Sequence, residues 1–236
     1  MRSIANIVQR ASATCAVVGA LTIGATAHAN TLDTTGWLNG NITMTVHQGS
    51  LTENVYVGGF TGVWHSGTPD VATPISFWCY ELTQYFNPGT SYPNYTAAPL
   101  SGATLIAELF NEAYAFAASS RIRSAAFQLA VWELEYDSGN LDVNAGTGFY
   151  ATGGGADGIA ARQQANAWLL GLGSPGTWSI TRLSNTQHQD FITGGDLPGA
   201  CCKGTVPEPP VLPLVLVAMG AAALVESRRR LRSRGV

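Results

Sequence analysis

The fold class is decided by residues 104–133, which read TLIAELFNEAYAFAASSRIRSAAFQLAVWE. Their apolar side chains recur three or four positions apart, which is the spacing of one face of an α-helix. The pattern predicts two helices, separated by a break at Ser119-Ser120. The chain therefore contains a helical region in its middle.

On both sides of this region the chain has the features of strands. Upstream, Leu38, Ile42, Met44 and Val46 alternate with polar residues, as on a half-buried strand. The other predicted elements are strands at 37–46, 53–60 and 75–82, a helix at 158–170, and a terminal hairpin of 177–183 with 188–193. Residues 144–158 are interpreted as a surface loop. We predict an α+β fold, a small antiparallel sheet or β-sandwich with a helical insertion.

The first 29 residues have the three-part layout of a secretory signal peptide. Arg2 and Arg10 are basic, residues 16–27 are mostly apolar, and the segment ends in the small-residue site Ala27-His28-Ala29. The layout predicts a mature chain that begins at Asn30. The alternative is a retained membrane anchor, but the apolar block is short and a good cleavage site follows it.

Residues 207–236 combine three features in a fixed order. Pro207-Glu208-Pro209 leads into an uncharged run that ends at Val225, and an arginine cluster at 228–234 follows. The run has about 17 residues against the ~20 of an ordinary membrane span. Because a basic cluster after an apolar run stays in the cytoplasm, everything upstream is predicted to lie outside it.

This order resembles the PEP-CTERM sorting signal of Gram-negative bacteria. The resemblance implies a membrane-anchored precursor that is processed near Pro207-Glu208-Pro209 by an exosortase-type transpeptidase. It also implies a destination at the cell surface or in the extracellular matrix. A signal peptide and a C-terminal transmembrane sorting helix would thus flank one domain at 30–199, followed by a linker at 200–206.

Composition limits what this domain can do. Residues 30–206 contain thirteen Asp and Glu against five Arg and Lys, a net charge of −8, which argues against nucleic-acid binding. Cys79 is the one cysteine of the predicted domain. Cys201 and Cys202 of the linker could pair with each other, bridge two chains, or be inert.

Two local patterns carry the functional hypothesis. Residues 77–82 read FWCYEL, a cysteine among aromatic residues on a predicted strand, and residues 126–133 read AFQLAVWE on a predicted helix. Gln128 and Trp132 are four residues apart, so they share a face that points inward. A buried amide without a partner costs about 1–3 kcal/mol, so Gln128 needs a polar neighbour. That neighbour could be a backbone carbonyl, a water molecule or Cys79.

A cysteine held against a glutamine carboxamide can displace ammonia and form an internal thioester. The bond requires that bulk water be kept away, and the aromatic residues Trp78, Tyr80, Phe127 and Trp132 are predicted to provide this shielding. The absence of lysine between residues 30 and 200 fits a domain that carries an amine-reactive group.

The two patterns resemble those of the Cys–Gln thioester domains of bacterial surface proteins, in which an aromatic-Cys-aromatic motif precedes a Gln-x-Ala-aliphatic-Trp motif. The resemblance implies that Cys79 donates the sulfur and Gln128 the acyl group, with Ala130, Val131 and Trp132 completing the second motif. Phe127 departs from the pattern, since many such domains have Thr there. The implied function is non-enzymatic, a covalent attachment to an amine- or hydroxyl-bearing partner.

Two other functions remain open. A non-covalent protein of an exopolysaccharide or biofilm matrix could bind glycans through aromatic platforms, for which the candidates are Trp37, Trp64, Trp78, Trp168 and Trp178. A hydrolase could use two of Glu133, Glu135 and Asp137, although Glu133 and Asp137 could also form a solvated helix face. His47, His65 and His188 lack metal-ligand spacing, so we predict neither a metal nor a cofactor.

Overall fold

A computed structural model describes residues 30–198, except 68, 138, 145–147, 175 and 177. The predicted signal peptide, the linker at 200–206 with its two cysteines, and the sorting signal at 207–236 lie outside the described residues. Within the described part, no helix is long and apolar enough to cross a membrane.

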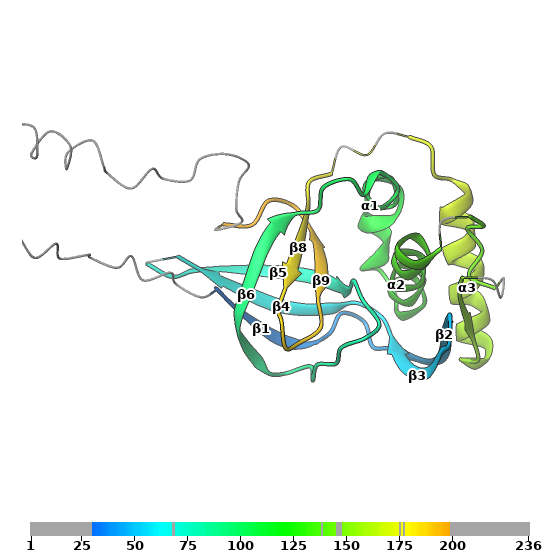
Figure 1. Ribbon diagram of the computed structural model, residues 1–236, viewed down its shortest axis with the longest axis horizontal. Coiled ribbons are helices and arrows are strands. Elements are labelled where there is room, and N and C mark those ends of the chain that lie inside the picture. Colours follow the sequence, from blue (N-terminus) through cyan, green and yellow to red (C-terminus); the bar gives the residue numbers. More distant parts are fainter. Residues whose placement is uncertain are drawn as a thin grey trace, which may run out of the picture.

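Six antiparallel strands close into a barrel in the order β1-β4-β5-β9-β8-β6 (Figure 1). These strands are β1 (Asn30–Trp37), β4 (Phe60–Ser66), β5 (Val71–Cys79), β6 (Ser91–Pro99), β8 (Ile180–Ser184) and β9 (Phe191–Gly194). Side chains alternate across each strand, and β4 shows this clearly because every second residue from Phe60 to Ser66 is buried. Aromatic rings pack in the barrel, with the centroids of Phe77 and Phe191 4.8 Å apart.

A second sheet of three strands lies beside the barrel, in the order β3-β2-β7. Strands β2 (Ile42–Gln48) and β3 (Leu51–Val57) form a hairpin that lies between β1 and β4 in the sequence. Strand β7 (Phe149–Thr152) pairs with β2. Because β7 belongs to the helical part of the chain, this sheet joins the N-terminal strands to the helices.

Three helices lie at one end of the barrel (Figure 1). They are α1 (Thr104–Ala117), α2 (Arg121–Tyr136) and α3 (Gly155–Leu170), inserted in the chain between β6 and β8. Helix α2 begins where the Ser120 hydroxyl accepts a hydrogen bond from the Arg123 amide at 3.2 Å. Every residue from Ser124 to Glu133 is buried, because α2 packs among α1, α3 and the strands.

The α+β class, the antiparallel pairing and the helical insertion are confirmed, as are the three helices and the terminal hairpin. Other expectations were wrong. The segment 37–46 is not one strand, because the chain turns at Gly40, whose φ of +84° suits glycine. The segment 53–60 likewise spans the end of β3 and the start of β4, and 144–158 contains strand β7 rather than loop alone. Strand β6 was not predicted.

Candidate functional site at the Cys79–Gln128 junction

Cys79 is the last residue of β5, and among the described residues no strand lies beside one edge of its backbone. Strand β4 pairs with β5 only as far as Phe60 opposite Phe77. On the other edge, the Tyr80 amide donates to the Asp190 carbonyl at 2.8 Å, so the β9 side is occupied. In an antiparallel ladder adjacent residues bond to opposite edges, so the N–H and C=O of Cys79 face the side that β4 leaves open. Buried backbone groups need partners, and these two must find them outside the sheet.

The side-chain amide of Gln128 takes the place of the missing strand. The Cys79 amide donates to Oε1 of Gln128 at 2.8 Å, and Nε2 of Gln128 donates to the Cys79 carbonyl at 2.8 Å. Gln128 is 0% exposed, so both ends of its amide are satisfied without water. The structure thus brings the two predicted thioester residues together, through the backbone of Cys79.

Helix α2 is fixed against the barrel one turn before Gln128. The Ser124 hydroxyl accepts from the Gly59 amide at 2.7 Å, and Nε1 of Trp78 donates to the Ser124 carbonyl at 3.2 Å. A Cβ at Gly59 would lie 2.6 Å from the Trp78 ring, so only glycine lets the chain pass this close. Two successive turns of α2 are therefore tied to β5 and the residues before β4, which sets the position of Gln128.

Cys79 lines a pocket of about 280 Å³ and is 9% exposed. The lining is mostly aromatic and amide side chains; it comprises Trp37, Asn54, Val55, Tyr56, Phe60, Cys79, Glu81, Leu82, Gln84, Tyr85, Phe86, Pro88, Trp132 and Gln189. Two of the lining residues carry a buried polar atom with no hydrogen-bond partner among the described residues, Nε1 of Trp132 and Oε1 of Gln84. Cys79 thus lies beside a mostly apolar pocket whose lining residues include two unsatisfied buried polar groups.

Of the four residues predicted to shield a thioester, the structure brings Trp132 into this pocket and not the other three. Trp78 and Tyr80 alternate with Cys79 along the chain, so their side chains point to the opposite face. Trp78 packs on Phe127, with ring centroids 4.7 Å apart, and Arg182 lies over the Tyr80 ring.

Most of the aromatic residues that surround the pocket were missed by the sequence reasoning, which named Trp37 only as a candidate for glycan binding and Trp132 as a shield. Trp37 ends β1, Phe60 begins β4, and Tyr85 and Phe86 follow β5. No local motif marks them as a group, because they meet only when the barrel closes. The run of polar and aromatic residues after Cys79 was the one available signal.

The surroundings keep the Cys79 sulfur protonated. Burial raises the pKa of the Cys79 thiol well above its usual range, and the negative charge of Glu81 raises this pKa further. The sulfur is therefore a thiol at neutral pH, and its attack on a carbonyl needs a base that removes the proton.

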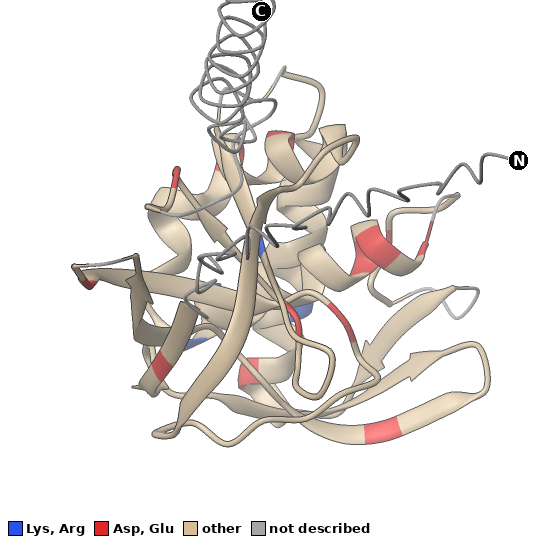
Figure 2. Ribbon diagram, turned by 60° about the vertical axis from the view of Figure 1, so that its left-hand side comes forward, with Lys and Arg blue, Asp and Glu red and all other residues tan. Residues whose placement is uncertain are grey.

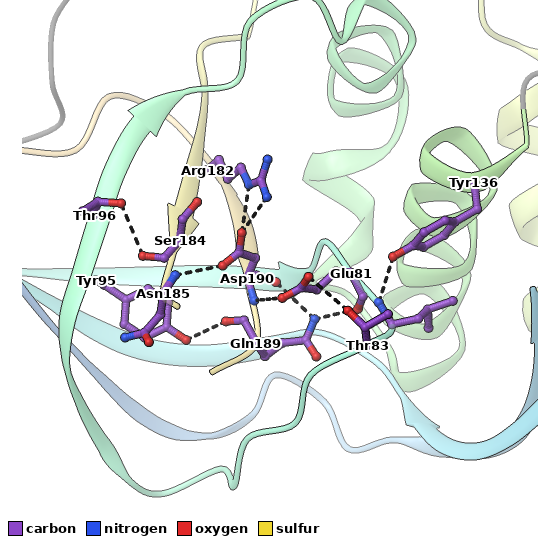
Figure 3. Close-up of polar contacts among 11 residues, drawn as sticks. Glu81, Thr83, Tyr95, Thr96, Tyr136, Arg182, Ser184, Asn185, Gln189 and Asp190 are labelled. Carbon is purple, nitrogen blue, oxygen red and sulfur yellow. Dashed lines mark hydrogen bonds and ion pairs between the residues drawn. The ribbon is translucent and has the colours of Figure 1, made fainter. Parts of the chain in front are cut away.

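The segment after Cys79 is held by polar contacts from two other parts of the fold, residues 189–190 before β9 and helix α2 (Figure 3). Nε2 of Gln189 donates to the Glu81 carbonyl at 2.6 Å, and the Asp190 amide donates to Oε1 of Glu81 at 3.1 Å. The Leu82 amide donates to the hydroxyl of Tyr136, on α2, at 2.9 Å. These bonds hold an irregular stretch of chain in place and leave the Glu81 carboxylate on the pocket wall.

Of the carboxylates considered for hydrolysis, Glu133 lies near Asp137, whose negative charge acts on it, whereas Glu135 lies elsewhere. Glu133 is 0% exposed, so it does not form the solvated helix face that the sequence left open as an alternative. Burial raises the pKa of Glu133 to about 7, and its Oε1 accepts from the Asp142 amide at 2.9 Å. Glu135 instead lines a separate surface pocket with Tyr80. Acidic residues are scattered over the described domain rather than gathered at one site (Figure 2).

Among the described residues, no group of three or more His, Cys, Asp or Glu side chains is arranged to hold a metal ion. The comparisons with known proteins add no family, since no protein-family model, curated protein or solved structure matches this chain. The function must therefore be argued from the site itself.

Proposed function

We propose that this is an exported surface or matrix protein in which Cys79 and Gln128 form an internal thioester that attaches the protein covalently to a partner. The observation that carries the proposal is the pair of 2.8 Å hydrogen bonds between the Gln128 amide and the backbone of Cys79. They hold the carboxamide beside the residue that bears the one thiol of the described domain.

The hydrogen bonds also suit the chemistry. As Sγ of Cys79 bonds to Cδ of Gln128, the carbonyl oxygen gains negative charge, and the Cys79 amide already donates to that oxygen. The C–N bond then breaks, and the thiol proton leaves with the nitrogen as ammonia. An incoming amine or hydroxyl reverses the pattern by bonding to Cδ, while the C–S bond breaks and the Cys79 thiol is restored. Each domain reacts once, so this is attachment rather than enzymatic turnover.

The pocket would both protect the thioester from hydrolysis and admit the nucleophile that opens it. Its apolar lining limits the water that reaches the thioester, whereas its volume of about 280 Å³ admits a side chain or a sugar hydroxymethyl group. The nucleophile is thus proposed to enter past Trp37 and Tyr85 and meet the bond beside Trp132.

Intact-mass measurement of the purified full chain, with its termini determined, tests the proposal. We expect the wild type to weigh one ammonia less than its sequence and Cys79 to resist alkylation. Methylamine should then add at Gln128 and expose the Cys79 thiol. Cys79→Ala and Gln128→Ala should each have their calculated mass, as should Gln128→Glu, because a carboxylate has no ammonia to expel. Gln163→Ala, at an exposed position of α3, is the matched control and should behave as the wild type. A wild type of full mass with a reactive thiol would overturn the proposal.

The destination is proposed from the two ends of the chain. Cleavage after Ala29 would release the mature protein, and residues 207–236 would anchor a precursor until an exosortase-type enzyme processes it. Deleting residues 206–236 should convert a membrane-associated precursor into a freely exported protein, as fractionation would show. Unchanged membrane association after this deletion would place the anchor elsewhere.

A second candidate function is favoured by the same pocket. The rings of Trp37 and Tyr56 pack edge to face in the pocket lining, with their centroids 6.1 Å apart. Asn54, Gln84 and Gln189 supply amide groups to the same lining. Aromatic faces with planar amides are typical of sites that bind sugars non-covalently. Cys79→Ala should then still retain a matrix polysaccharide in a pull-down, whereas Tyr56→Ala should lose it.

A further inference from the structure

We propose that Glu81 is the acid–base residue of the Cys79–Gln128 reaction, taking the thiol proton as the thioester forms and the proton of the nucleophile as it opens. This inference rests on the proposed thioester and adds to it the group that moves the protons.

The position of Glu81 follows from the strand. The hydrogen bond from the Tyr80 amide to the Asp190 carbonyl continues the β5–β9 ladder one residue past Cys79. In an extended chain, residues two apart point to the same side, so Glu81 and Cys79 share a face. Both line the same pocket of about 280 Å³, and the charge of Glu81 acts on the Cys79 thiol.

Two hydrogen bonds orient the carboxylate of Glu81 and leave it able to accept a proton. Oε1 accepts from the Asp190 amide at 3.1 Å, and Oε2 accepts from the Thr83 hydroxyl at 3.3 Å (Figure 3). A carboxylate has about four acceptor positions, so lone pairs remain for a proton. No described Arg or Lys pairs with Glu81, because the nearby Arg182 is bonded to Asp190 at 2.6 Å.

The other described groups around the pocket fit this role less well. Tyr85 also lines it, but a hydrogen bond to Glu53 raises the pKa of Tyr85, and a phenol is a poor base at neutral pH. Tyr95 donates its hydroxyl hydrogen to the Gln189 carbonyl at 2.6 Å. Tyr136 accepts from the Leu82 amide, and burial raises its pKa. No histidine is among the described residues of the pocket lining.

The proton balance closes without a further reactant. When Sγ attacks Cδ of Gln128, Glu81 takes the thiol proton and passes it to Nε2, so that ammonia leaves and the carboxylate is restored. When an amine or hydroxyl later attacks Cδ, Glu81 takes its proton and passes it to Sγ as the C–S bond breaks. The same carboxylate thus serves both steps, and a protonated thiol becomes a usable nucleophile.

The test compares Glu81→Gln with the wild type in the full chain. Gln keeps an oxygen that can accept from the Asp190 amide but cannot act as a base. After refolding from urea, loss of ammonia followed by mass should be at least about 100-fold slower in Glu81→Gln, the lower end of general acid–base effects. Methylamine opening of any thioester that forms should slow similarly. Glu112→Gln, at an exposed position of α1 and outside the described pocket lining, is the matched control and should react like the wild type.

The outcomes separate this inference from the proposed function. A wild type that never loses ammonia would overturn the thioester and this role together. A thioester that forms and opens at wild-type rates in Glu81→Gln would overturn the role alone. If Glu81→Gln does not fold, Glu81→Asp decides, because Asp keeps a carboxylate but draws it back from Cys79 by one methylene. Ammonia loss and methylamine opening should both be slower in Glu81→Asp than in the wild type. Wild-type rates in Glu81→Asp would overturn the role.

Discussion

Gln128 and Glu133 lie five residues apart on the same helix, both are 0% exposed, and they solve the problem of burial differently. Gln128 satisfies both ends of its amide on the backbone of Cys79. Glu133 satisfies Oε1 on the Asp142 amide, but its Oε2 has no hydrogen-bond partner among the described residues. The Gln128 amide thus has partners at both ends, whereas the Glu133 carboxyl group has a partner at only one oxygen.

The difference teaches what each polar group contributes. A neutral amide with all its bonds made is a fixed connector that holds α2 on the end of β5 at any pH. A buried carboxyl with an unpaired oxygen has its pKa raised to about 7, so its charge and its cost depend on pH. We therefore expect the Gln128 region to be rigid and the Glu133 region to respond to conditions.

The largest loss of stability is expected when the side-chain amide of Gln128 is removed. In a Cys79→Ala background, where no thioester can form, Gln128→Leu should strongly lower the free energy of unfolding. Leu has a similar size but leaves the N–H and C=O of residue 79 buried and unpaired, at about 1–3 kcal/mol for each group. Urea unfolding monitored by tryptophan fluorescence measures the loss.

The exposed Gln163→Leu provides the control for that measurement and should change stability by no more than about 0.5 kcal/mol. Equal stability of the two variants would mean that the Gln128 bonds do not hold α2 on β5.

The second effect concerns Glu133 and has a definite sign. Its folded-state pKa of about 7 lies above the 4.5 of a freely solvated glutamate side chain, so the folded protein binds the proton more tightly than the unfolded chain. Stability from this group is present at low pH and declines as the pH rises from about 4.5 to about 7. Glu133→Gln carries no charge and keeps an acceptor for the Asp142 amide. It should therefore be more stable than the wild type at pH 8, by up to about 3 kcal/mol, and similar at pH 4.5.

Urea unfolding at both pH values measures this difference. Glu135→Gln, on the exposed side of α2, should shift stability little at either pH. A wild type as stable as Glu133→Gln at pH 8 would mean that Glu133 is solvated or paired in solution.

Local residue pattern was enough to predict the parts of the fold that local physics dictates. The helical spacing of 104–133 and 158–170 located all three helices, and the inward face of α2 placed Gln128 in the core. The presence of the two motifs led to the prediction that Gln128 meets Cys79. The backbone contact itself depends on β4 beginning only at Phe60, opposite Phe77, which no local pattern reveals.

The barrel and the pocket lining could not be predicted for the same reason. Closure pairs β1 with β6, which are far apart in sequence, and it brings Trp37 together with Tyr85 and Gln189. Trp78 and Tyr80 were expected at the thioester because they neighbour Cys79 in sequence. Because side chains alternate along a strand, Trp78 and Tyr80 point to the opposite face. The same two-residue period predicts that Glu81 lies on the face of Cys79.

The smallest effect extends the comparison to the surface. His65 is charged when protonated and has both ring nitrogens paired, with Nδ1 2.8 Å from Asp70 and Nε2 3.1 Å from Asp33. The hydrogen bond to Asp70 raises the pKa of His65, although burial opposes it. Its stabilisation is therefore complete below the unfolded-state pKa of about 6.5 and is lost as the pH rises through the raised folded value. Because the side chain is 28% exposed, the pairs should contribute only about 0.2–1 kcal/mol. His65→Gln should remove this amount at pH 5.5 and almost nothing at pH 9, as urea unfolding at low and high salt would measure. A loss at pH 5.5 larger than the Glu133→Gln effect at pH 8 would contradict the view that burial, rather than the number of partners, sets the size of these pH effects.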